Sequence, residues 1–120
     1  MKTRLMVVDD SHIMEMQICE LLNGSDFEVA AYCENGEAAI SCYQEIQPDI
    51  VTMDIVMPGL DGLETSQIIL TEHPEARIIL ISSMDYEDTI REAKAIGIKS
   101  LLHKPIDRGG LIEALESVLP

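Results

Sequence analysis

The fold follows from residues 48–62, which read Pro-Asp-Ile-Val-Thr-Met-Asp-Ile-Val-Met-Pro-Gly-Leu-Asp-Gly. The apolar, partly β-branched run at residues 50–53 lies between Pro48 and a Met-Pro-Gly turn, a pattern that predicts a short strand buried on both faces. Asp54 then falls at the carboxyl end of this strand. Because that edge of a parallel sheet forms the binding crevice, Asp54 is either a site residue or the cap of a turn.

The composition is that of one acidic, aliphatic domain over residues 1–120, since this length leaves no room for a second core. Lys and Arg number 8 against 22 Asp and Glu, and the formal charge of −14 disfavours direct nucleic-acid binding. Partners are expected to present basic or apolar patches, or the chain to hold a cation. The first apolar run is too short for a signal peptide and no segment reaches membrane-spanning length, so we expect a cytoplasmic domain without membrane contact.

The cysteines and histidines show no pattern typical of a disulfide framework or a zinc site. The three cysteines are odd in number and lack a CxxC pair, so we expect them to be reduced and buried or half-buried. The histidines have no partner spacing for a metal, and His12 is expected to be solvated. These residues are Cys19, Cys33, Cys42, His12, His73 and His103.

Apolar runs alternate along the chain with segments of helical periodicity. Strands are predicted at residues 5–8, 27–32, 50–53, 77–81 and 98–103, and helices at 11–24, 36–47, 62–73, 85–96 and 107–119. Ser11 is a candidate N-cap of the first helix. Five such alternations predict an α/β, doubly wound (βα)5 flavodoxin-like fold. Its parallel sheet has the order 2-1-3-4-5, with helices on both faces and the crevice between the first and third strands.

Polar residues stand at the carboxyl ends of four of these strands, and the predicted fold gathers them into one crevice. They are Asp9, Asp10, Asp54, Ser82 and Lys104. Neighbouring carboxylates repel one another, and oxygen ligands without His or Cys favour Mg²⁺ as the compensating cation. Mg²⁺ usually takes only one or two carboxylates, which leaves another free for chemistry. Each residue alone is more typical of a turn cap or a solvated charge, but their joint placement favours a site.

A carboxylate beside Mg²⁺ and a lysine ammonium suits phosphoryl transfer, because both cations offset the charge on the phosphoryl oxygens. Asp is a known nucleophile toward phosphorus, so the group predicts an aspartyl phosphate. The hydroxyl of Ser82 is then placed to hydrogen-bond a phosphoryl oxygen.

With these motifs in order, the chain resembles the receiver domains of response regulators in two-component signalling, close to single-domain regulators of the CheY type. The resemblance covers the whole chain and rests on Val7-Val8-Asp9-Asp10-Ser11, residues 48–62, Ser82-Ser83 and His103-Lys104-Pro105. It implies that Asp54 accepts a phosphoryl group from a histidine kinase or histidine phosphotransfer domain. It also implies that Asp9, Asp10, Asp54 and the backbone carbonyl of Val56 hold Mg²⁺.

The resemblance further implies that Ser82 is the switch residue, that Lys104 contacts the phosphoryl group and that the Lys104-Pro105 peptide is cis. The chain departs from the family pattern at Leu101, where Tyr or Phe is usual, so coupling to the output face is expected either to use aliphatic repacking or to be weak. Val56 and Met84 are apolar at the two variable positions near the acceptor and the switch residue. Without a polar side chain there to orient water, we expect a comparatively long-lived phosphoryl group.

The main functional hypothesis is a signalling domain that catalyses only its own phosphorylation and dephosphorylation. Its readout, on the last two helices and the fifth strand, would control a downstream protein or a fused effector domain, as in chemotaxis or transcription, or form a dimer. One alternative is a receiver-like scaffold that binds partners without phosphorylation. The other is a Mg²⁺-dependent phosphatase, which would need a substrate-capping element that the chain has no residues left to build.

Overall fold

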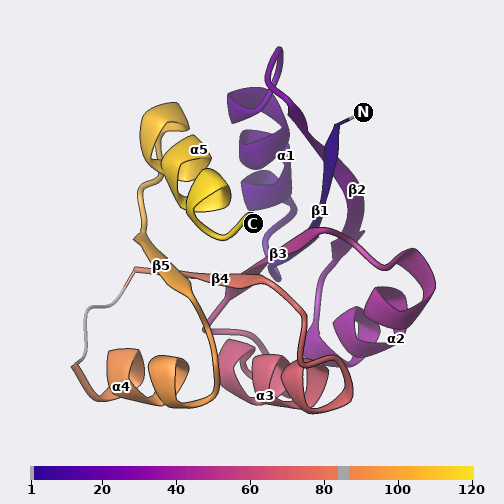
Figure 1. Cartoon of the computed structure of the whole chain (residues 1–120), viewed down its shortest axis with the longest axis vertical. Coiled ribbons are helices and arrows are strands. Elements are labelled where there is room, and N and C mark those ends of the chain that lie inside the picture. Colours follow the sequence, from indigo (N-terminus) through magenta and orange to yellow (C-terminus); the bar gives the residue numbers. More distant parts are fainter. Residues whose placement is uncertain (1, 84–86) are drawn as a thin grey trace.

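The computed structural model describes residues 2–83 and 87–120, in which five strands alternate with five helices (Figure 1). The strands are β1 (Thr3–Val8), β2 (Phe27–Cys33), β3 (Ile50–Asp54), β4 (Ile78–Ser82) and β5 (Ser100–His103). The helices are α1 (His12–Leu21), α2 (Gly36–Ile46), α3 (Gly62–Glu72), α4 (Glu87–Ala95) and α5 (Arg108–Ser117). Met84 and the predicted start of the fourth helix at Asp85 lie outside the described residues. Within the described part, no helix has both the length and the apolar character needed to cross a bilayer.

The strands form one parallel sheet in the order β2-β1-β3-β4-β5, which confirms the predicted doubly wound topology. Helices α1 and α5 cover one face of the sheet, and α2, α3 and α4 cover the other (Figure 1). The second strand lies at an edge, as its mixed polarity predicts. The order reverses between β1 and β3, so their carboxyl ends frame the crevice in which this fold binds ligands.

Side chains of the central strands alternate between two apolar cores. In β1, Leu5 and Val7 pack in the core under α1 and α5, whereas Met6 and Val8 pack in the core under α2, α3 and α4. The isoleucines and leucine of β4 alternate in the same way. A strand covered on both faces buries every side chain, which explains why these strands are continuous apolar runs in the sequence.

The register of β2 against β1 shifts between Leu5 and Met6, so that the pairing skips Ala30. Such a β-bulge reverses the faces to which the following side chains point. Beyond it, Tyr32 pairs with Val7 and packs on the α1 and α5 side of the sheet. The carboxyl end of β2 therefore presents an aromatic side chain toward α1.

Three helices begin at a residue whose side chain accepts a hydrogen bond from a backbone N–H of the first turn, as expected of good N-caps. These residues are Asn35, Asp61 and Asp107. Ser11 is the N-cap residue of α1, as predicted, although its side chain makes no capping hydrogen bond. Instead, the backbone N–H of Ser11 donates to Oδ1 of Asp9 at 2.8 Å, which ties the start of α1 to the site.

Two expectations are corrected. The fifth strand begins at Ser100 rather than at residue 98, because the N–H of Ile98 donates to the carbonyl of Ala93 at 3.0 Å and closes the last turn of α4. Cys19 is exposed rather than buried, since it follows Ile18, the buried position of α1, and points away from the sheet. All three cysteines are free, as predicted, with Cys33 buried and Cys42 half-buried.

Gly62 brings the first turn of α3 directly against the end of β3. A Cβ at this position would press on the carbonyl oxygen of Asp54 and lie 2.8 Å from Cα of Ile55. The N–H of Gly62 also donates to the carbonyl of Ile55 at 2.8 Å. The absence of a side chain at residue 62 therefore sets how closely α3 packs beneath Asp54.

We expect Gly62→Ala to lower the free energy of unfolding by roughly 1–3 kcal/mol, because the added methyl meets backbone atoms that cannot rotate away. Gly109→Ala is the matched control, since its Cβ would meet only a side-chain oxygen of Asp107 at 3.8 Å. The control should unfold at the same or a slightly higher urea concentration, because Ala favours helix over Gly. Equal stability of the two variants would contradict the close packing at Gly62.

Candidate functional site

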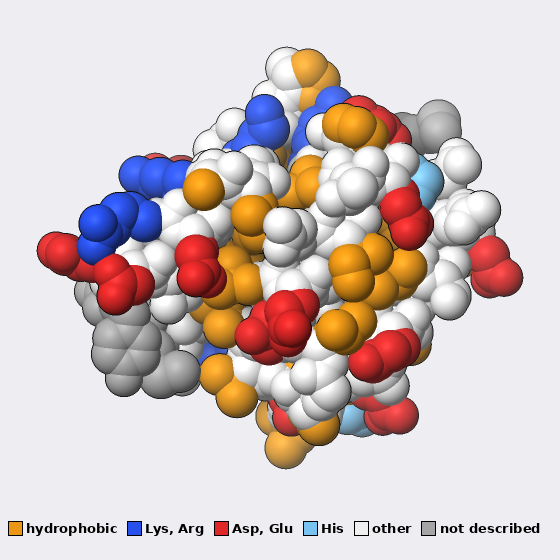
Figure 2. Space-filling view, turned by 90° about the horizontal axis from the view of Figure 1, so that it is seen from below, with side chains coloured by type: hydrophobic (Ala, Val, Ile, Leu, Met, Phe, Trp, Pro, Cys, Tyr) orange, Lys and Arg blue, Asp and Glu red, His pale blue; other side chains and the backbone are white. Residues whose placement is uncertain are grey.

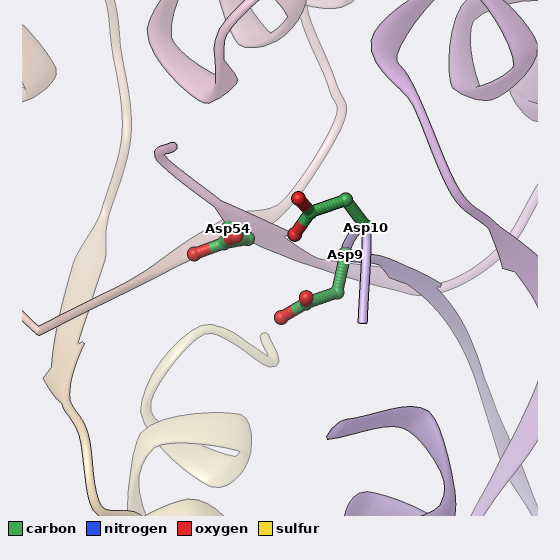
Figure 3. A group of neighbouring side chains, drawn as sticks. All are labelled: Asp9, Asp10 and Asp54. Atoms are coloured by element: carbon green, nitrogen blue, oxygen red, sulfur yellow. The ribbon is translucent and has the colours of Figure 1, made fainter. Parts of the chain in front are cut away.

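The carboxyl edge of the sheet brings together three carboxylates from two neighbouring strands. Asp9 and Asp10 follow β1, and Asp54 is the last residue of β3. One carboxylate oxygen from each lies within 4.8 Å of the others, and Figure 3 shows the three side chains reaching into the same space. Asp9 and Asp54 are only 2% and 6% exposed, while Asp10 is open to solvent. The site therefore has a buried floor and one accessible side.

Lys104, which follows the edge strand β5, brings an ammonium group to this cluster. Its Nζ lies 3.2 Å from Oδ1 of Asp54 and 3.5 Å from Oδ2 of Asp9. The backbone N–H of Lys104 donates to the carbonyl of Ser82 at 2.8 Å, which fixes the start of its side chain at the end of β4. The Lys104-Pro105 peptide is cis, as the resemblance implied.

Burial sets the electrostatics of the two inner carboxylates. It raises the pKa of Asp54 from its ordinary value of 3.8, and the neighbouring charge of Asp9 raises this pKa further. Burial likewise raises the pKa of Asp9. The ammonium of Lys104 lowers the pKa of both carboxyls, although less than burial raises it. One lysine thus offsets only part of the cost of placing these carboxylates together.

The residues present fit a magnesium ion. Three carboxylates against one ammonium leave a formal charge of −2, which a divalent cation would balance. The donors are all carboxylate oxygens, with no His or Cys in the cluster, and this donor set is typical of Mg²⁺ rather than zinc. The exposed side at Asp10 leaves room for the water ligands that Mg²⁺ retains.

The other predicted site residues that the structure describes differ in how far they are exposed. Ser82 is the last residue of β4, the strand that pairs with β3, and its side chain is 3% exposed. Val56 lies two residues beyond Asp54 with its side chain 58% exposed, while its backbone carbonyl stays a predicted metal ligand. Leu101 is half-buried in β5 and packs against the core under α4. Met84 lies outside the described residues.

His12 is exposed to solvent, as expected, but it also has partners that were not predicted from the sequence. His12 is 68% exposed, with Nδ1 3.0 Å from Oε1 of Glu15, and its ring lies 5.5 Å from that of Tyr32. The Tyr32 hydroxyl donates to the backbone carbonyl of Asp9 at 2.8 Å, a contact that the sequence analysis also missed. The available signal was the position of Tyr32 near the carboxyl end of the strand that neighbours β1. His73 has a separate partner, because its ring lies 4.8 Å from the ring of Tyr43.

Comparison with known proteins shows the family to which the chain belongs. The model of the response regulator receiver domain matches residues 5–116. The chain belongs to the response-regulator receiver family. The chemotaxis protein CheY of Listeria monocytogenes is 41% identical to this receiver over 113 residues, which are 94% of this chain and 95% of that protein. CheY of Bacillus subtilis is 38% identical over 119 residues, 99% of each chain.

Solved receiver structures share the fold. The complex of CheX, CheY, BeF3 and magnesium from Borrelia burgdorferi contains a chain that superimposes with a TM-score of 0.91 at 30% identity, covering 96% of this receiver and 87% of that chain. The response regulator domain of Thermotoga maritima CheB gives a TM-score of 0.90 at 29% identity, with 98% and 96% covered. This receiver is therefore a CheY-like signalling domain of two-component response regulators.

We expect Asp54→Asn to raise the stability of the metal-free receiver at neutral pH. Because folding raises the pKa of Asp54, this carboxyl contributes stability that is complete below its unfolded pKa, near 3.8, and lost as the pH rises through its folded pKa. The gain of the variant should therefore shrink as the pH falls toward 4. Urea unfolding with a chelator at both pH values measures it, with the exposed Asp26→Asn as control. A variant less stable than the wild type at neutral pH would contradict this electrostatic account.

Proposed function

We propose that Asp54 accepts a phosphoryl group from a phosphohistidine in a Mg²⁺-dependent reaction. The observation that carries the proposal is the distance of 3.2 Å between Nζ of Lys104 and Oδ1 of Asp54, beside two further carboxylates within 4.8 Å. In this step an Asp54 oxygen forms a bond to phosphorus as the bond from phosphorus to the donor imidazole nitrogen breaks. The imidazole leaves with the electron pair.

Each neighbouring residue has a role in this proposal. Asp9, Asp10, Asp54 and the backbone carbonyl of Val56 would hold the metal, which when bound supplies positive charge to the phosphoryl oxygens. Lys104 already lies against Asp54 and would contact the phosphoryl group through its ammonium. Ser82, buried at the end of β4, would donate a hydrogen bond from its hydroxyl to a phosphoryl oxygen. The magnesium and BeF3 of the Borrelia complex support this assignment.

We propose that phosphorylation shifts an equilibrium whose readout is the surface formed by α4, β5 and α5. Apart from Lys104, which lies at the site, residues 87–117 carry four basic and six acidic side chains, so this surface is less acidic than the rest of a chain with a formal charge of −14. Figure 2 shows the face below α2, α3 and α4, where acidic side chains are scattered among hydrophobic ones and basic ones gather along one margin. A protein target, a fused effector domain or a second copy would meet less repulsion at the α4, β5 and α5 surface than elsewhere.

The remaining parts of the proposal follow from the same site. The donor is a histidine kinase or a histidine phosphotransfer domain, and residues 1–120 act as one cytoplasmic receiver domain. Its chemistry is limited to uptake and loss of its own phosphoryl group. Direct binding to nucleic acid is disfavoured by the acidic surface.

Incubation with Mg²⁺ and acetyl phosphate should add one phosphoryl group to the wild-type protein, as measured by intact mass. Asp54→Asn should show no adduct, because the nucleophilic oxygen pair is gone, whereas Asp26→Asn should be labelled like the wild type. Omitting Mg²⁺ should abolish labelling in every case, because the phosphoryl charge is then uncompensated. Labelling that persists in Asp54→Asn would assign the acceptor to another residue.

We expect the phosphoryl group to be long-lived, because the exposed side chain of Val56 offers no polar atom to orient a hydrolytic water. Val56→Asn should shorten the half-life by roughly tenfold or more, since it adds a hydrogen-bonding group of similar size. The loss of phosphoryl mass after removal of the donor measures the half-life, with the apolar Val56→Ala as control. A half-life that is the same in the Asn and Ala variants would remove Val56 from this role.

A further inference from the structure

Tyr32 makes a long-range hydrogen bond to the loop that carries the acidic pair. Its hydroxyl oxygen lies 2.8 Å from the backbone carbonyl oxygen of Asp9, 23 positions away in the chain. A carbonyl oxygen can only accept, so the phenol is the donor. The contact exists because the bulge at Ala30 points Tyr32 toward the α1 side of the sheet.

The carbonyl that Tyr32 holds belongs to the peptide group joining Asp9 to Asp10. Asp9 has other anchors, since its N–H donates to the carbonyl of Cys33 at 3.1 Å and its carboxylate accepts from Ser11 and approaches Lys104. The carboxylate of Asp10 makes no hydrogen bond or ion pair within residues 2–83 and 87–120. Without a contact on its carboxylate, Asp10 is positioned through its backbone, and the hydrogen bond from Tyr32 restricts the peptide group that precedes it.

Contacts on α1 hold the Tyr32 ring itself in place. The ring of His12 lies 5.5 Å from that of Tyr32, at an interplanar angle of 56°. Nδ1 of His12 in turn lies 3.0 Å from a carboxylate oxygen of Glu15. The half-buried Tyr32 is thus bound at its hydroxyl and in tilted contact with the ring of His12, so two contacts restrict its orientation.

We propose that Tyr32 is a positioning residue for the metal site, acting through the Asp9-Asp10 peptide to aim the Asp10 carboxylate at Asp54. This inference rests on the proposed Mg²⁺-dependent function and assigns part of that site's geometry to a side chain that touches neither metal nor phosphoryl group. Side chains that hydrogen-bond to a metal ligand without touching the metal commonly have a large effect on metal affinity.

The test compares Mg²⁺ binding by the wild type, Tyr32→Phe and Tyr43→Phe, using calorimetry and amide chemical shifts. Tyr32→Phe keeps the ring and removes only the donor, so we expect Mg²⁺ affinity to fall roughly three- to tenfold, the size of one neutral hydrogen bond. The Asp9 carbonyl carbon and the Asp10 amide should shift in the metal-free protein. Tyr43→Phe is the matched control, because the Tyr43 hydroxyl makes no hydrogen bond to the described residues. It should bind Mg²⁺ like the wild type.

Urea unfolding shows that each variant is folded before its affinity is compared. Unchanged Mg²⁺ affinity in a folded Tyr32→Phe would overturn the inference, while Mg²⁺ binding by the wild type would leave the proposed function standing. Equal losses in Tyr32→Phe and Tyr43→Phe would also overturn it, because a general effect on stability would then explain both. A wild type that binds no Mg²⁺ would defeat the proposed function, and the inference with it.

Discussion

Three carboxylates lie at the carboxyl edge of the sheet beside one ammonium group, which pairs with only two of them, Asp9 and Asp54. This excess of negative charge is the constraint on which the rest of the structure depends. Burial raises the pKa of both Asp9 and Asp54, so the folded chain holds these groups at a cost in stability. The two apolar cores supply the compensating free energy, because they bury nearly every side chain of the central strands. This cost has a chemical consequence, because an excess of negative charge on oxygen ligands favours the binding of a divalent cation.

The central and the edge strands of the sheet supply different groups to the site. The central strands β1 and β3 lead to the carboxylates of Asp9, Asp10 and Asp54, held rigidly because both faces are packed. The two edge strands supply the donors, since Lys104 follows β5 and Tyr32 belongs to β2. Edge strands are half-exposed and tolerate polar and aromatic residues, so donors can approach the carboxylates from both sides without entering the core.

The order of the sheet could be predicted because strands buried on both faces appear as continuous apolar runs, and because the polar residues that end them share one edge. Asp54 and Lys104 were found in this way. Tyr32 was not, because its direction depends on the bulge at Ala30, and a shift of one residue in register sends a side chain to the opposite face. Nothing in the local sequence fixes that bulge, which arises from pairing with a strand about 25 residues away. The contact of the Ser11 backbone N–H with Asp9 could likewise not be predicted, because it depends on how the loop after β1 folds back on itself.

The aliphatic residue at position 101 bears on how a change at the site would reach the proposed readout surface of α4, β5 and α5. Leu101 pairs with Leu80 in the sheet and lines a cavity of about 80 Å³ with Ile90 and Ile98. A leucine fills space by changing rotamer within such a cavity, whereas a ring would have to swing as a rigid plate. The site has a more direct connection through the backbone, because the carbonyl of Ser82 accepts from the N–H of Lys104 at 2.8 Å. A displacement of either residue would therefore be passed to the joined ends of β4 and β5, next to the aliphatic packing around Leu101. This favours aliphatic repacking as the means of coupling.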